Sequence, residues 1–523
     1  MIRRVLAGLL AALAMVAVAQ AAPVRTEAGL VAGVADRGVQ SFKGIPFAAP
    51  PVGDLRWRPP AKAPRWTGVR KADAYAPGCL QIPLPISASG SPPVPTSEDC
   101  LYLNVWTPAK SPAARLPVMV WIYGGGFAAG ATSYPAYDGT SLARKGVVVV
   151  SVAYRLGPFG FLAHPELSAE SPAHGSGTYG LMDQIAGLQW VKRNIAGFGG
   201  DPGRVTIFGE SAGGIAVSML AASPRAHGLF QRAISESGGS FAPAKSGDEG
   251  GENVPTLAKA EAQGVDFLKT LGAASIAAAR RAPAEDLIKA TKPGLAGFWP
   301  ALDGDVIPGD GYLLYQRGRY NDVPVLIGSN ADEGGLFVRS ITADAFKAQV
   351  RSGYGAYAGR ILDAYPAGSD AEALRSARDL MRDYAFAWPT WSWARLQSRT
   401  GKSPVYVYYF NHRPPYPDIP TFRGVGATHG GEIAYVFGNA DARWSADDRA
   451  TSEAIMGYWV NFAATGDPNA RGAAAWPRFS NARPRAMRLD TQPGAMPIPN
   501  LRQLGTLEAY YAWRRAQAGH QGR

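Results

Sequence analysis

The strongest chemical signal in this chain is a serine held between glycines. The segment Gly209-Glu210-Ser211-Ala212-Gly213 lies between an expected strand, 204–208, and an expected helix, 213–222. So tight a turn from strand to helix needs small residues around the serine, and it raises the hydroxyl above the sheet beside a helix N-terminus. The pattern predicts that Ser211 is a nucleophile.

A serine hydroxyl is a weak nucleophile at neutral pH and needs a base, which in folds with this turn follows the serine and an acid along the chain. Four histidines lie downstream: His227 precedes any plausible acid, and His520 lies in the C-terminal tail. His412 follows the expected strand 404–410 and is interpreted as a solvated residue at a strand end. His429 lies in GVGATHGGE, where glycines give a loop conformational freedom, so it is the predicted base.

Two carboxylates are candidates for the acid that orients the histidine. Asp332 and Glu333 lie just beyond the end of the expected strand 323–328. Either could accept the imidazole N–H and favour the imidazolium that forms during a reaction. The residues themselves leave the choice open, and we expect the other carboxylate to bind backbone donors of its loop.

Three consecutive glycines upstream of the serine complete the candidate site. Gly124, Gly125 and Gly126 follow the expected strand 117–123. Without side chains, their backbone N–H groups could approach an oxygen that becomes negatively charged, and the N–H of Ala212 could be a further donor. The pattern predicts an oxyanion hole.

The elements that must position these residues indicate an α/β protein. Several β-branched runs lack strict alternation, as is typical of strands covered on both faces in a parallel sheet. Helical patterns lie between them, so we expect a large, mostly parallel, doubly wound sheet flanked by helices. The expected strands are 117–123, 146–154, 204–208, 323–328 and 404–410, and the clearest helices are 181–193 and 213–222.

The N-terminus has the pattern of a secretory signal peptide. Arg3 and Arg4 precede an apolar run, 5–19, and the small-residue site Ala19-Gln20-Ala21. We expect residues 1–21 to be removed and residues 22–523 to form a single catalytic domain that is secreted or periplasmic. The run is short for a membrane anchor, and no later segment is long and apolar enough to span a bilayer.

The chain has two cysteines, Cys79 and Cys100. In an oxidising compartment two cysteines that flank a proline-rich loop predict one disulfide bond. A catalytic thiol is a weaker interpretation, because neither cysteine has a histidine nearby in the sequence. A zinc site is weaker still.

The composition is that of a globular protein with a basic surface. Hydrophobic residues make up 46% of the chain, charged residues 18%, and the formal net charge is +12. The Lys and Arg residues are scattered and form no basic stripe with aromatic residues between them, so we do not expect nucleic acid as a partner. No pattern predicts an oligomeric state.

Longer motifs resemble those of the type-B carboxylesterases, the family that includes the cholinesterases. FGGDPGRVTIFGESAG, 198–213, is similar to the family's signature around the nucleophile, and EDCLYLNVW, 98–106, is similar to its second signature. The likeness extends over most of the chain. The other matching segments are FKGIPFAAPPVGDLRWRPP, WIYGGGF, AYRLGPFGF, GDVIP, NADEGGLF, THGGEIAYVFG and YWVNFAATGDPN.

This resemblance implies the α/β-hydrolase fold and cleavage of small-molecule carboxylic esters through an acyl-enzyme, without a metal or organic cofactor. It implies that Glu333 is the acid of the triad, with Asp332 a neighbour. The remaining implied roles are oxyanion donors for Gly125, Gly126 and Ala212, the family's first disulfide for Cys79 and Cys100, residues next to the triad for Glu210 and Ser237, and ion pairs for Arg56 with Glu98 and Arg155 with Asp183.

One departure from the family pattern narrows the expected substrates. In cholinesterases the loop between these two cysteines supplies a tryptophan that holds a quaternary ammonium by cation–π attraction. Here no aromatic residue lies between Cys79 and Cys100, so choline esters are not expected as preferred substrates. The alternatives are a specialist for anionic or aromatic esters and a non-catalytic adhesion or binding module, against which the intact Ser211, His429 and Glu333 argue.

Overall fold

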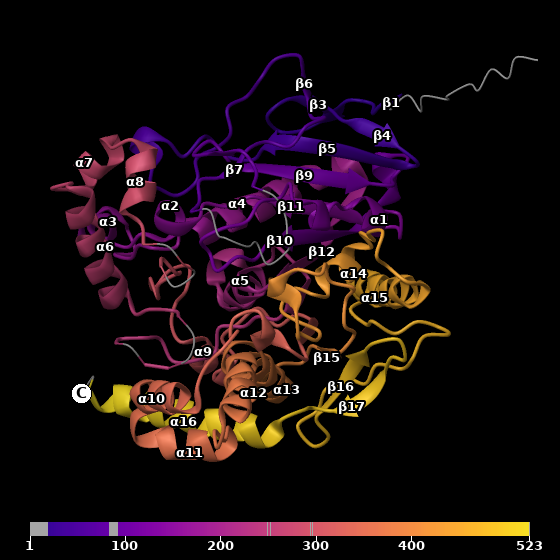
Figure 1. Cartoon of the computed structure of the whole chain (residues 1–523). Coiled ribbons are helices and arrows are strands. Elements are labelled where there is room, and N and C mark those ends of the chain that lie inside the picture. Colours follow the sequence, from indigo (N-terminus) through magenta and orange to yellow (C-terminus); the bar gives the residue numbers. More distant parts are fainter. Residues whose placement is uncertain are drawn as a thin grey trace, which may run out of the picture.

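A computed structural model describes residues 19–82, 93–247, 249–250, 253–292, 294 and 297–521. Within these residues one twelve-stranded sheet runs through the molecule with helices packed around it, beside small sheets of three and two strands (Figure 1). The first 18 residues, which hold most of the predicted signal peptide, lie outside the described residues. Ala19 and Gln20 form β1, which pairs antiparallel with β4.

The elements have the following bounds. The strands are β1 Ala19–Gln20, β2 Val24–Arg25, β3 Leu30–Ala32, β4 Val34–Asp36, β5 Val39–Pro46, β6 Val69–Lys71, β7 Gly78–Cys79, β8 Thr96–Ser97, β9 Tyr102–Thr107, β10 Leu116–Ile122, β11 Val148–Val152, β12 Gly200–Glu210, β13 Arg232–Glu236, β14 Val325–Asn330, β15 Val405–Phe410, β16 Arg485–Leu489 and β17 Gly494–Pro497. The α-helices are α1 Thr140–Ala143, α2 Gly157–Phe161, α3 Pro165–Glu170, α4 Tyr179–Asn194, α5 Ala212–Ala222, α6 Leu257–Leu271, α7 Ile276–Arg281, α8 Ala284–Ala290, α9 Gly311–Gln316, α10 Ala343–Tyr354, α11 Ala358–Ala364, α12 Asp370–Arg382, α13 Trp388–Thr400, α14 Ile433–Phe437, α15 Ala446–Thr465 and α16 Leu501–Gln521.

The five predicted strands are present as β10, β11, β12, β14 and β15, and the two predicted helices as α4 and α5. Every residue of β11 and of β14 is buried, which explains why their sequences lack the alternation of a half-exposed strand. From β11 through β10, β12, β13, β14 and β15 to β16 all neighbours run parallel. The pairs at both edges are antiparallel, so the sheet is mostly parallel, as predicted.

Helices cover both faces of this sheet. The hydroxyl of Ser235 in β13 donates to the Gly214 carbonyl in α5 at 3.1 Å. The carboxylate of the next residue, Glu236, accepts from the indole N–H of Trp459 in α15 at 2.8 Å. Because successive side chains of a strand point to opposite faces, α5 and α15 lie on opposite sides of the sheet.

Two predicted ion pairs and the predicted disulfide brace the N-terminal half. Arg56 contacts Glu98 at 2.7 Å, and Arg155 contacts Asp183 at 2.7 Å. The guanidinium of Arg155 and the carboxylate of Asp183 are both buried, so each charge is compensated by the opposite charge of its partner instead of by water. Cys79 and Cys100 form a disulfide, and both are buried.

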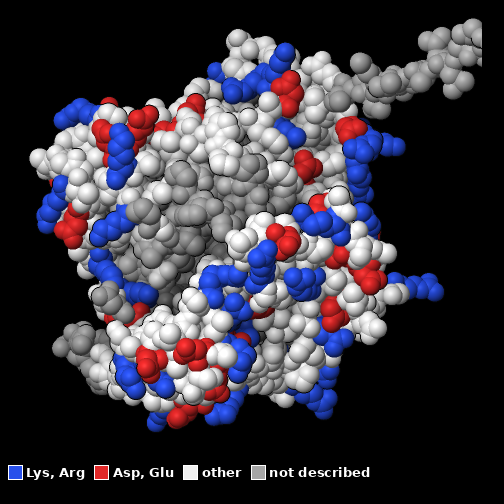
Figure 2. Space-filling model, in the orientation of Figure 1, with Lys and Arg blue, Asp and Glu red and all other residues white. Residues whose placement is uncertain are grey.

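The surface of the described part mixes charges of both signs. On the face shown in Figure 2, Lys and Arg side chains lie among Asp and Glu side chains around its edge. Among the helices of the described residues, none has both the length and the apolar character required to cross a membrane.

Replacing both cysteines tests the contribution of the disulfide. Cys79→Ala with Cys100→Ala should lower the free energy of unfolding by about 3 kcal/mol, since the cross-link restricts the unfolded chain. The thermal unfolding midpoint measures the change. Addition of a reductant should lower the midpoint of the wild type and leave that of the double variant unchanged; equal midpoints for the two proteins without reductant would contradict the prediction.

Candidate active site

Ser211 occupies the sharp turn between β12 and α5. Its backbone has φ +57° and ψ −125°, a conformation that non-glycine residues rarely adopt, while Ala212 begins the helix. The Ser211 N–H donates to the Glu236 carbonyl of β13 at 2.9 Å, which ties the turn to the neighbouring strand. A Cβ atom on Gly213 would lie 2.0 Å from the Ile122 carbonyl oxygen, so the small residue predicted there is a steric requirement.

His429 lies in the loop between β15 and α14, and its ring is joined to the loop after β14. Its Nδ1 is 2.7 Å from Oε2 of Glu333, and since a carboxylate accepts, Nδ1–H is the donor. Both side chains are buried. Asp332, the other candidate acid, instead accepts from the Gly426 N–H at 2.7 Å and holds the loop before His429. Tertiary structure thus distinguishes two carboxylates that the residue types left equivalent.

The opposite edge of the imidazole faces the turn that carries the serine. Its Nε2 lies 3.2 Å from Oε1 of Glu210, the residue directly before Ser211. Among the described residues, the Ser211 hydroxyl has no hydrogen-bond partner. The ring of His429 is therefore held between the Glu333 carboxylate and the β12–α5 turn.

A group of buried carboxylates gives this site its electrostatic character. Burial raises the pKa of Glu210 to about 7, although the positive charge of His429 opposes the shift. Burial also raises the pKa of Glu432 to about 8. Burial on its own would lower the pKa of His429, but the charge of Glu210 and the hydrogen bond to Glu333 outweigh it and raise the pKa to about 9.

Glu333 is fixed by more than the histidine. Its Oε1 accepts from the hydroxyl of Ser237 at 2.6 Å and from the N–H of Asn330 at 2.7 Å. The side-chain amide of Asn330 in turn donates to the Thr428 carbonyl at 2.9 Å and to the Glu432 carboxylate. Ser237 was expected next to the acid and lies there; the contacts of Asn330 and Glu432 were not anticipated. In the sequence, the signal that could have pointed to Glu432 as a member of the site is its position three residues after His429.

The glycine loop after β10 lies against the serine turn. A Cβ on Gly124 would be 2.6 Å from the Glu210 carbonyl oxygen and 2.9 Å from the Ser211 Cβ, so no side chain can be accommodated. Gly125 and Gly126 both have positive φ, +105° and +63°. The N–H of Ala212 belongs to the first turn of α5, whose N–H groups have no partner within the helix. Backbone donors from two segments are thus close to the serine.

The remaining candidate histidine has another role. His412 is half-buried, and its Nε2 lies 2.7 Å from Oδ1 of Asp448. The interpretation of His412 as a solvated residue is therefore wrong: packing against α15 supplies a carboxylate partner that the sequence around His412 does not reveal.

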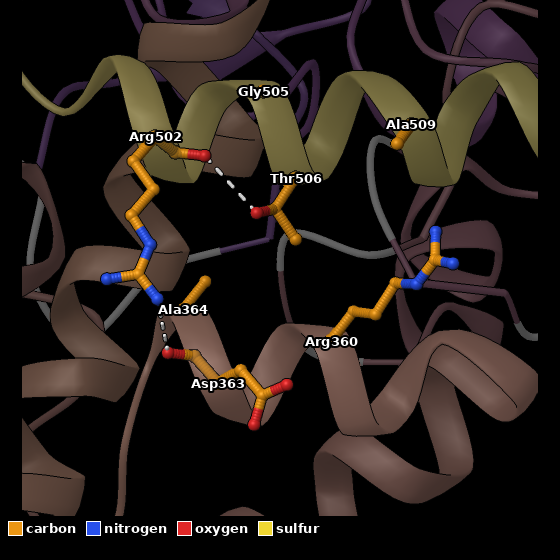
Figure 3. A pocket seen from close by; sticks show the side chains of 7 residues that line it. All are labelled: Arg360, Asp363, Ala364, Arg502, Gly505, Thr506 and Ala509. Atoms are coloured by element: carbon orange, nitrogen blue, oxygen red, sulfur yellow. Dashed lines mark hydrogen bonds between the residues drawn. The ribbon is translucent and has the colours of Figure 1, made fainter.

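A groove elsewhere on the molecule is separate from this constellation. It lies between α11 and α16 and has a volume of about 360 Å³ (Figure 3). Arg502 and Arg360 lie at its two ends in this view, and Arg502 donates to the Asp363 carbonyl at 3.3 Å. Among the described residues that line the groove, none belongs to the candidate site.

Replacing Glu210 tests the electrostatics of the buried group. A carboxyl whose folded pKa is about 7, above an ordinary value of 4.5, stabilises the fold below pH 4.5 and loses that contribution as the pH rises to about 7. Glu210→Gln should therefore flatten the decline of the thermal unfolding midpoint over this interval. Glu453→Gln, at an exposed position, should follow the wild-type curve; identical curves for all three proteins would rule the account out.

Comparison with known proteins identifies the family of this chain. The model of the carboxylesterase family matches residues 20–504. The chain is 39% identical over 488 residues to the fumonisin B1 esterase of Sphingopyxis macrogoltabida, covering 87% of this chain and 84% of that protein. It is 37% identical over 494 residues to the para-nitrobenzyl esterase of Bacillus subtilis (strain 168), covering 90% and 95%.

Solved structures show the same architecture. A structure of PNB esterase, 36% identical, superposes with a TM-score of 0.79 over 93% of this chain and 99% of that chain. A thermophilic PNB esterase, 35% identical, gives a TM-score of 0.80 over the same shares. Because the family model spans most of the chain, relatives 37–39% identical are esterases, and solved PNB esterases share the architecture, the protein belongs to the carboxylesterase family and is a serine carboxylesterase with the α/β-hydrolase fold.

Proposed function

We propose that this protein hydrolyses small-molecule carboxylic esters with a triad of Ser211, His429 and Glu333. The observation that carries the proposal is the buried 2.7 Å hydrogen bond between His429 and Glu333, with the other edge of the imidazole turned toward the residue before Ser211. A histidine held in this way at a strained serine turn is the arrangement that nucleophilic acyl transfer needs.

The reaction would proceed in two steps. The Ser211 oxygen attacks the ester carbonyl while Nε2 of the neutral form of His429 takes the hydroxyl proton, and a tetrahedral intermediate forms. Because the pKa of His429 is raised to about 9, this neutral form increases as the pH rises toward that value. His429 returns the proton to the alkoxy oxygen, the C–O bond breaks, and the alcohol leaves an acyl-serine. Water then attacks the acyl carbon as His429 accepts its proton, and the acid departs as Ser211 regains its hydrogen.

The other predicted residues would support these steps. The N–H groups of Gly125, Gly126 and Ala212 would stabilise the negative oxygen of both tetrahedral intermediates. Glu333 would fix the imidazole and favour its charged form. Glu210 adds negative charge beside Nε2, and Ser237 holds the Glu333 carboxylate, so both act through the triad.

We also propose that the protein works outside the cytoplasm. The pattern of residues 1–21 is that of a leader for export, and the disulfide between Cys79 and Cys100 would persist in an oxidising compartment.

Loss of the nucleophile tests the function against the alternative of a non-catalytic module. Ser211→Ala should lower kcat for 4-nitrophenyl butyrate by at least about 10⁴-fold, because the covalent pathway is removed. His429→Ala should have a comparable effect. His227→Ala, at an exposed histidine, should retain wild-type activity; release of nitrophenol at equal rates by the wild type and Ser211→Ala would overturn the proposal.

A preference for esters with an anionic portion is the second candidate. The guanidinium of Arg339 is exposed and donates to the Gly335 and Pro420 carbonyls at 3.1 and 2.6 Å. In the described part of the chain no carboxylate lies within ion-pair distance of it. Arg339 follows Phe337 by two residues, and the ring of Phe337 lies 5.1 Å from that of His429. Its guanidinium also binds the carbonyl of Gly335, two residues after Glu333, and these two links to the site support the candidate.

A pair of substrates tests this candidate. Between 4-nitrophenyl hydrogen succinate and 4-nitrophenyl butyrate, the ratio of kcat/KM should favour the anionic ester at low salt. Arg339→Gln should lower the ratio by about two- to fivefold, as for an exposed charge pair. The control is Arg471→Gln, at another exposed arginine; a ratio that is the same in all three proteins excludes a role for Arg339.

A further inference from the structure

The imidazole of His429 has an aromatic neighbour as well as carboxylate neighbours. The ring of Phe386 lies stacked on it, with the ring centroids 4.4 Å apart and an angle of 26° between the planes. Phe386 is 5% exposed, so it can meet the histidine but hardly a substrate. Phe337 contacts the same imidazole at a tilt of 56° and is 39% exposed, which places it toward solvent.

Phe386 belongs to a local irregularity between two helices. Residues Asp383–Ala387 form a π-helical turn that joins α12 directly to α13. Each residue of an α-helix turns the direction of its side chain by about 100°, so the wider turn changes which side chains face the site. Such turns cost stability relative to a regular helix and occur frequently at functional sites.

Buried polar contacts fix this turn in place. The Asp383 carboxylate, fully buried, accepts from Nε of Arg382 at 2.8 Å and from the Tyr365 hydroxyl at 2.9 Å. Arg382 also donates to the Ala331 carbonyl at 3.4 Å, two residues before Glu333. The hydroxyl of Thr390, just after the turn, donates to the Gly328 carbonyl of β14 at 3.4 Å. The π-turn is thus anchored to the same strand and loop that carry the acid.

The two contacts of the imidazole restrain different motions. A hydrogen bond from Nδ1 to Glu333 fixes one edge of the ring but leaves rotation about the line of that bond. A flat aromatic surface on the face of the ring opposes that rotation, because tilting the plane would lose the stacking contact. The aromatic face also interacts more favourably with a positively charged ring than with a neutral one.

We propose that Phe386 is a positioning residue for the reaction, and that the π-turn exists to press its ring against the face of the His429 imidazole. This inference rests on the proposed triad. The charged groups around the imidazole are Glu210 from β12, Glu333 from the loop after β14, and Glu432 at the start of α14; Phe386 is the apolar member of that shell.

The test replaces the aromatic ring by an aliphatic side chain of similar bulk. Phe386→Leu should lower kcat for 4-nitrophenyl butyrate by roughly two- to tenfold, the effect of losing one aromatic pair. KM should change by less than about twofold, because the side chain is buried beneath the histidine. Since the imidazolium loses a favourable neighbour, the acidic limb of the kcat/KM profile should move to lower pH by roughly half a unit.

Two further variants separate positioning from general packing. Phe386→Tyr keeps the aromatic face and should restore kcat and the position of the acidic limb. Phe346→Leu makes the same change at a buried phenylalanine of α10, which has no ring contact with His429 in the described structure; it should lower the thermal midpoint without moving the limb. If Phe386→Leu does not fold, Phe386→Met takes its place, because methionine fills the space without an aromatic face.

Some results would overturn the inference about Phe386, and others would overturn the proposed function itself. An acidic limb in Phe386→Leu that coincides with those of the wild type and Phe346→Leu overturns the inference, and so does a Phe386→Tyr protein that folds but behaves like Phe386→Leu. Ser211→Ala is measured alongside. If the wild type is no faster than Ser211→Ala, the proposed function fails; if it is faster and only the Phe386 comparisons fail, the proposed function stands without this inference.

Discussion

The burial of an imidazole among three glutamates is the constraint on which the architecture around the site depends. Glu210, Glu333 and Glu432, whose charges act on His429, are all at most 2% exposed, and Glu236 is buried next to Glu210 and Glu432. Removing carboxylates from water is costly unless each finds a partner. Hydrogen-bond partners for these carboxylates come from several elements: Ser237 just after β13, Asn330 at the end of β14, Trp459 in α15 and the imidazole itself.

The parallel sheet makes this convergence possible. In a parallel sheet the carboxyl ends of neighbouring strands meet at one edge, so the segments that follow β12, β13, β14 and β15 all reach the same place. Two residues there, Ser211 and Ser237, have positive φ. Strain of this kind persists only where surrounding contacts determine the conformation, and the hydrogen bond between the Ser211 N–H and the Glu236 carbonyl is one of them.

The same packing links stability to the proposed chemistry. The charge of Glu210 raises the pKa of His429 and so makes its imidazole a stronger base. Burial of the same carboxylate raises its own pKa, so its ionisation at higher pH lowers the stability of the fold. The π-helical turn before α13 is a second feature that combines stability and chemistry in this way. It interrupts a regular helix at the point where the ring of Phe386 stacks on the imidazole of His429. Membership of the carboxylesterase family indicates ester hydrolysis as the overall reaction. The buried carboxylates and Phe386 are the residues of this chain that would set how its histidine takes part.

The sequence alone determined the features that depend on local backbone geometry. The serine turn, the glycine loop and the buried strands could be predicted because a sharp turn admits only small residues and a strand covered on both faces must be apolar along its whole length. Two cysteines that flank a proline-rich loop, behind a predicted leader for export, were enough to predict the disulfide. The strand β13 was missed, since its short segment Arg232–Glu236 ends in polar residues that only the site explains.

Only the tertiary structure decided which side chains meet. Asp332 and Glu333 are adjacent and chemically alike, and their different contacts follow from which one reaches the imidazole of His429 and which one accepts from the backbone N–H of Gly426 in the same loop. Glu432 and Phe386 gave no signal strong enough to single them out, because their importance lies in neighbours from distant strands and helices. Residue types and spacing fix what a backbone segment can do locally, whereas a buried contact depends on how separate segments pack, and that is set by the whole fold.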